Sequence, residues 1–189
     1  MDNLCFILSV AAVPVLVVLV LWSAARQRTA RAAGWAQFTK DTGIATNGTW
    51  PAISFHAERD GVAVSFRQTV STGDRTPGVE FGTLIARPNV DLTDIRVLPQ
   101  VPGGADVPIG SAEFQTQFRV RTDDPARASA ILNPRAQRAM LDGILLCPTF
   151  AVGEKGVVTT HAGMADPDVV ARELDVLVAI AKALDEPAS

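Results

Sequence analysis

The chain has 189 residues, of which 48% are hydrophobic, and its 17 Lys and Arg against 20 Asp and Glu leave a net charge of −3. From residue 43 onward, 13 basic residues stand against 18 acidic ones, and this acidity argues against nucleic acid as a partner. Of the two cysteines, Cys5 lies in an N-terminal apolar segment and Cys147 near the other end, so a disulfide within one folded domain is excluded.

The uncharged N-terminal segment is the strongest feature of the sequence. Nearly every residue from Leu4 to Trp22 is apolar, and about 20 such residues cross the apolar core of a bilayer as a helix. This predicts a transmembrane anchor at residues 1–25, in contact with the lipid bilayer through residues 4–22. A cleaved secretory signal is the alternative, but the residues before the apolar run include no Lys or Arg.

Positive charge beside the apolar run predicts its orientation. Arg26, Arg28 and Arg31 follow the run, and basic residues next to a span stay in the cytoplasm. We therefore expect a single-pass protein of the cell membrane with a cytoplasmic C-terminal domain, an exported domain being the alternative. Helix-forming residues then predict a juxtamembrane helical stalk at residues 26–42 and a folded domain at residues 43–189.

Alternating apolar and polar residues predict several strands. The segment ISFHAERDGVAVSF alternates on both sides of Asp60-Gly61, a dipeptide typical of a two-residue hairpin turn, and the register pairs Phe55 with Phe66. The same alternation predicts strands in VEFGTLIA, DIRVLP and EFQTQFRVR, and a further hairpin in TFAVGEKGVVTTH.

Three helix starts share one signature, an Asp or Asn that can cap the helix followed by a proline at the first helical position. They are Asp124-Pro125, Asn133-Pro134 and Asp166-Pro167. The last helix carries an apolar stripe at spacings of three and four residues, formed by Val170, Leu174, Leu177, Ala181 and Leu184. The expected fold class is α+β, with an N-terminal transmembrane helix followed by a twisted antiparallel sheet that has helices packed on one face.

The residues that carry chemistry are few. No nucleotide-binding, hydrolase or metalloprotease motif occurs, and two His without a Cys pair argue against zinc, so no catalytic residue, metal ligand or cofactor is assigned. Four residues are candidates for a polar site on the exposed sheet face: His56, Glu58, Arg67 and Arg119. The alternative is that they form the solvated face of a half-buried sheet. Cys147 is expected to be a small buried apolar residue.

A long irregular segment is a further candidate. Pro99–Ser111 contains three Pro and three Gly and fits no regular element. Loops of this length are often functional, which suggests a partner-binding loop, and the alternative is a solvated connection between strands.

The C-terminal half carries a resemblance. The segment FRVRTDDPARASAILNPRAQRAMLDGI, from Phe118 to Ile144, combines a strand, an Asp-Pro helix, a turn and a second helix. With the anchor before it and the hairpin and terminal helix after it, it resembles uncharacterised small single-span membrane proteins of actinomycete-type bacteria, which carry a domain of unknown function. The resemblance implies an α+β fold and a bacterial source, and it implies no catalytic or binding residues.

Together these observations predict a membrane-tethered, non-enzymatic binding or scaffold module whose partner would be a protein. The alternative is a small-ligand-binding or enzymatic domain that uses polar residues on the exposed sheet face.

Overall fold

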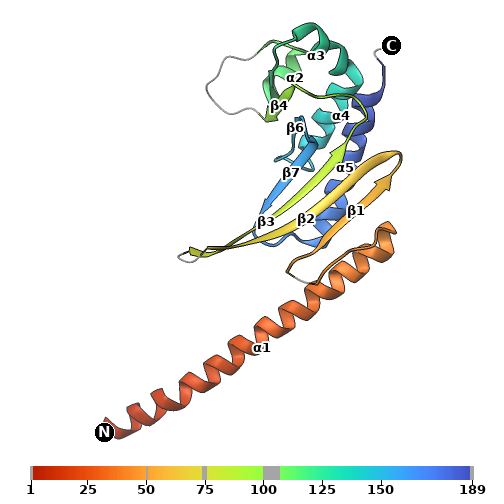
Figure 1. Cartoon of the computed structure of the whole chain (residues 1–189). Helices are drawn as coiled ribbons and strands as arrows, with labels where there is room; N and C mark the ends of the chain where they lie inside the picture. The colour runs from red at the N-terminus through yellow and green to blue at the C-terminus, as the bar shows by residue number, and fades with distance from the viewer. Residues whose placement is uncertain (1, 50, 74–75, 100–106, 188–189) are drawn as a thin grey trace.

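The computed structural model describes residues 2–49, 51–73, 76–99 and 107–187, with side chains from residue 17 onward except at residue 24 and residues 70–80. The elements follow one another as shown in Figure 1: α1 (Asp2–Thr42), β1 (Ser54–Arg59), β2 (Val62–Gly73), β3 (Thr76–Arg87), β4 (Arg96–Pro99), α2 (Ala112–Gln117), β5 (Phe118–Arg121), α3 (Pro125–Ile131), α4 (Pro134–Ile144), β6 (Ala151–Gly153), β7 (Gly156–Ala162) and α5 (Pro167–Asp185).

The described strands form one sheet in the order β1-β2-β3-β7-β6-β4-β5, and every neighbouring pair is antiparallel. Helix α5 packs on β2, β3 and β7, and α4 packs on α5. The predicted α+β class, with an antiparallel sheet and helices packed on it, is confirmed.

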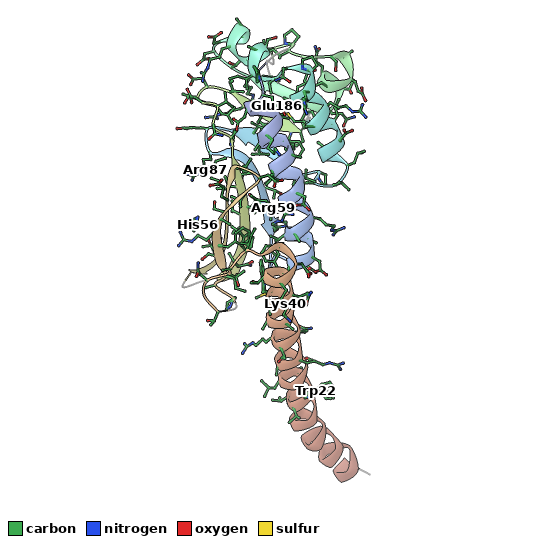
Figure 2. The ribbon with its side chains drawn as sticks, turned by 90° about the vertical axis from the view of Figure 1, so that its right-hand side faces the viewer. Trp22, Lys40, His56, Arg59, Arg87 and Glu186 are labelled. Carbon is green, nitrogen blue, oxygen red and sulfur yellow. The ribbon has the colours of Figure 1, made fainter. Side chains whose placement is uncertain are left out.

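The two faces of the sheet differ in exposure. On β2, Val62, Val64 and Phe66 are buried, whereas the alternating residues Ala63 and Arg67 are exposed. We call the side with the buried residues, which packs against the helices, the covered face, and the opposite side the open face. Figure 2 shows the sheet and the helices as two layers, with the open face turned away from α5.

The β1–β2 hairpin has the predicted register. Phe55 pairs with Phe66. The turn residues Asp60 and Gly61 have φ angles of 54° and 81°. Two positive φ values in a row characterise the turn whose twist matches a two-stranded ribbon, which explains why this dipeptide places the turn correctly.

The last turns of α1 belong to the hydrophobic core. Trp35 and Phe38 are only 4% and 3% exposed. The Trp35 ring lies 5.3 Å from the Phe66 ring, and the Phe38 ring lies 5.3 Å from the Phe55 ring. The helix ends at Thr42, followed by Gly43 with a φ of 71°, so the predicted stop is correct.

The described residues contain no helix that is both long enough and apolar enough to cross a membrane. Most of the predicted anchor lies in residues 2–16, whose side chains are outside the described part of the chain.

The three predicted helix caps are confirmed. Each capping side chain accepts hydrogen bonds from backbone N–H groups of the first turn: Asp124 from Arg127, Asn133 from Arg135 and Ala136, and Asp166 from Asp168. The five residues of the predicted apolar stripe on α5 are all buried.

One predicted strand is wrong in its first half. Residues Ala112–Gln117 form α2, and the strand begins only at Phe118. The Ser111 hydroxyl starts the helix by accepting a hydrogen bond from Phe114 N at 3.2 Å. Phe114 and Phe118 are both buried, and their spacing of four residues suits one helical face as well as alternate strand positions.

The candidate loop Pro99–Ser111 falls mostly on residues 100–106, which lie outside the described residues.

Candidate functional site

The four candidate polar residues occupy two distant places on the open face. His56 and Glu58 alternate along β1, and Arg67 lies on β2 opposite Ser54. Arg119 lies on β5, at the other edge of the sheet, with five strands between it and β1. Figure 2 shows His56 on the side of the sheet away from α5. The structure therefore brings three of the four residues into one neighbourhood and separates Arg119 from them.

An apolar row crosses the open face between these edges. Ile85 of β3 lies opposite Val158 of β7, which in turn lies opposite Ala151 of β6. The pairing of Val97 with Val152 places the next residue, Leu98 of β4, beside Ala151. We call these four partly exposed residues the central row: Ile85, Val158, Ala151 and Leu98. Sequence reasoning missed the row because it depends on strand order.

Arginines border the central row. Arg87 lies two residues after Ile85 on β3, and Arg67 pairs with Thr83, two residues before Ile85. Arg96 lies on the β4 part of the same face. Three of these arginines make no ion pair or side-chain hydrogen bond with another described residue: Arg67, Arg87 and Arg96. The β2–β3 part of the face thus presents cations on both sides of an apolar surface.

Acidic residues are sparse among these strands. Glu58 is the one acidic side chain at the described open-face positions of the strands. In the neighbouring turns, Asp94, Asp123 and Glu154 line a hollow of about 290 Å³ together with Arg96 and Arg121. Positive charge therefore dominates at Arg67 and Arg87, whereas around Arg96 acidic and basic side chains are about equal in number.

A groove of about 470 Å³ lies on the helical side, between the β1–β2 turn, α4 and α5. Its charges are largely paired within the groove. Arg59 lies 2.7 Å from Asp175, Arg138 lies 3.1 Å from Asp142, and Arg135 pairs with Glu186. Because these surface charges pair with one another, they leave little net charge for a ligand.

A polar cluster lies inside the covered face. Nε2 of His161 on β7 and Oε2 of Glu173 on α5 are 2.8 Å apart, and both side chains are largely buried. The contact is not a hydrogen bond, and neither atom has a hydrogen-bond partner within the described chain. Close by, the hydroxyls of Thr149 and Thr159 share a hydrogen bond of 3.0 Å.

Cys147 completes this cluster. Its thiol is fully buried, as predicted. Burial is the main cause that raises the pKa of the Cys147 thiol, and it outweighs the opposing effect of the Thr159 hydroxyl. The Glu173 carboxylate raises the same pKa further. A protonated, buried thiol is a poor nucleophile.

Glu173 was not among the candidates from the sequence. It lies three residues after Val170 and one before Leu174, so its position on the helix falls on the apolar stripe. A Glu on an apolar helical stripe could have marked this residue as a candidate, because charged residues are rarely buried without a partner.

Comparison of the chain with protein-family models, with curated proteins and with solved structures gave no match. The resemblance to small single-span membrane proteins therefore stays a prediction.

Proposed function

We propose that this protein is a membrane-tethered, non-enzymatic binding module that presents the open face of its sheet to a partner. The observation that carries the proposal is the central row, an apolar surface that none of the packed helices covers. A sheet in water normally alternates apolar residues toward the core with polar residues toward solvent. Partly exposed apolar residues in one row therefore favour a surface that another molecule covers.

The tether is proposed from the sequence. In the sequence, residues 4–22 form an uncharged apolar segment of about the length that crosses a bilayer as a helix. Arg26, Arg28 and Arg31 after it favour a domain on the cytoplasmic side. The Arg26 guanidinium lies 5.4 Å from the centre of the Trp22 ring, an arrangement that suits the interface between lipid and water.

The tether and the domain are joined by one continuous helix. Helix α1 is continuous from Asp2 to Thr42, and its last turns pack into the core through Trp35 and Phe38. From Trp22 to Gly34, where the helix meets Pro167 of α5, an α-helix rises about 18 Å. The proposed module thus holds its open face at a set distance from the membrane.

Site-specific photo-crosslinking in native membranes tests this function. A photoreactive residue at Thr83, next to the central row, should give a discrete crosslinked product. The matched control is Ala179, an exposed position on α5. Products from Ala179 but none from Thr83 would contradict the proposal.

The alternative, an enzyme or small-ligand site on the polar sheet face, has less support. Ligand sites are usually concave, and the two hollows described above are lined by residues other than His56, Glu58 and Arg67.

A further inference from the structure

We propose that the open face binds an acidic amphipathic helix of a partner protein, with the apolar stripe of that helix on the central row and its carboxylates on Arg67 and Arg87. This inference rests on the proposed function and names the chemistry of the partner.

The spacing of the central row suits a helix that crosses the strands. Ile85, Val158 and Ala151 lie on three consecutive strands, which are about 4.8 Å apart in a sheet. Side chains three or four residues apart on a helix are about 5–6 Å apart. Successive residues of an apolar helical stripe can therefore sit on successive strands.

The charges lie where the flanks of such a helix would be. Arg87 is on one side of Ile85 and Arg67 is on the other, beside Thr83. A guanidinium matches a carboxylate with two parallel hydrogen bonds. Because neither arginine is paired with another described residue, a partner carboxylate would not have to displace an existing ion pair.

The same features weigh against other occupants. A second copy would bring Arg67 and Arg87 against arginines of the same kind, which repel. A single-stranded nucleic acid would find few rings to stack on, because Phe81 and His56 are the aromatic side chains at the described open-face positions of the strands. An anionic bilayer surface offers negative headgroups but no apolar side chains for the central row.

Two synthetic helices test the inference against the full chain in nanodiscs of neutral phosphatidylcholine. Both peptides carry the same leucine stripe, flanked in one by Glu and in the other by Lys. The Glu peptide should bind and the Lys peptide should not. The double variant Arg67→Glu/Arg87→Glu should weaken binding of the Glu peptide at least about tenfold. Arg172→Glu, an exposed change on α5, should leave it unchanged.

Equal binding of both peptides, or binding that ignores the double variant, would overturn the inference. So would binding of phosphatidylserine vesicles or a single-stranded oligonucleotide that is lost in the double variant while the Glu peptide does not bind. Crosslinking from Thr83 separates the two levels of the argument. If the crosslinked product persists in the double variant, the binding module is supported and the acidic helix is rejected. If Thr83 gives no product, the binding module itself is rejected.

Discussion

The buried contact between His161 and Glu173 joins strand β7 to helix α5 within the small polar cluster of the covered face. The two atoms are 2.8 Å apart, and neither has a hydrogen-bond partner in the described chain. A buried polar pair of this kind costs desolvation free energy that its own contact offsets only in part. Its main effect on stability should therefore appear when one partner is removed and the other is left behind.

Replacing one partner should cost more than replacing both. We expect His161→Leu to lower the free energy of unfolding by about 1–3 kcal/mol, because the Glu173 carboxylate is left buried alone. The double variant His161→Leu/Glu173→Leu should recover most of that loss. Thermal unfolding of the two single variants and the double variant measures the coupling. Additive losses would show that the two side chains do not stabilise each other.

Cys147 should be inert in the folded protein. Because burial raises its pKa, the thiolate is scarce at neutral pH, and a maleimide should modify Cys147 only after denaturation. The test uses the Cys5→Ser background. The matched control adds Ser129→Cys, on the exposed surface of α3, to a cysteine-free chain. Rapid labelling of folded Cys147 would contradict the burial.

The raised pKa of Cys147 also makes the stability of the fold depend on pH. The thiol of the unfolded chain loses its proton at a lower pH than the folded one, so the unfolded state is favoured increasingly as the pH rises past about 8.5. This contribution to stability is complete at neutral pH and is lost in alkaline solution. Comparing the pH dependence of unfolding of Cys147→Ala with that of the parent chain isolates it.

At the level of elements, the junction between α1 and the sheet decides where the folding unit begins. The rings of Trp35, Phe38, Phe55 and Phe66 lie in mutual contact, with centroids 5.3 to 5.5 Å apart. Gly34 lies against Pro167 at the start of α5, where a Cβ atom would be 3.2 Å from the proline ring. The end of the predicted stalk therefore packs as part of the domain core.

A fragment that begins at Gly43 loses these contacts and should unfold less cooperatively than one that begins at residue 27. In the full chain, Trp35→Ala should lower the free energy of unfolding by about 3–5 kcal/mol, since it leaves a cavity between α1 and β2. Trp22→Ala is the matched control, because Trp22 is 60% exposed. Equal cooperativity of the two fragments would support Gly43 as the boundary of an autonomous domain.

At the scale of the whole molecule, the continuous α1 helix couples the proposed membrane anchor to the open face. The domain is acidic and the residues after the apolar segment are basic. This charge arrangement favours retention of the basic segment on the cytoplasmic side.

We expect a cysteine at Ser129 to be protected in intact cells. In a Cys5→Ser/Cys147→Ser background, a membrane-impermeant maleimide should label Ser129→Cys only after the membrane is opened. Asp2→Cys, before the predicted span, should label in intact cells and serves as the control. Labelling of Ser129→Cys from outside would place the domain on the exterior and reject the cytoplasmic orientation.

Short-range features of the sequence predicted much of the fold. The Asp60-Gly61 turn and the three Asp-Pro or Asn-Pro caps were correct, because each depends on a few neighbouring residues. The stripe on α5 was also correct, because the helical period repeats along one continuous segment. The strand predicted for residues 113–121 was wrong over residues 113–117, because Phe114 and Phe118 fit both periods and Ser111 caps a helix there.

The sequence by itself determined the α+β class, the first hairpin and the uncharged segment from which an anchor is proposed. Only the tertiary structure decided which distant strands became neighbours. Strand order joined Ile85, Val158 and Ala151 into the central row and separated Arg119 from His56. The packing of α5 on β7 set His161 against Glu173. The physical reason is that turn and cap preferences act over a few residues, whereas the partner of a strand is chosen by burial of apolar surface across the whole chain.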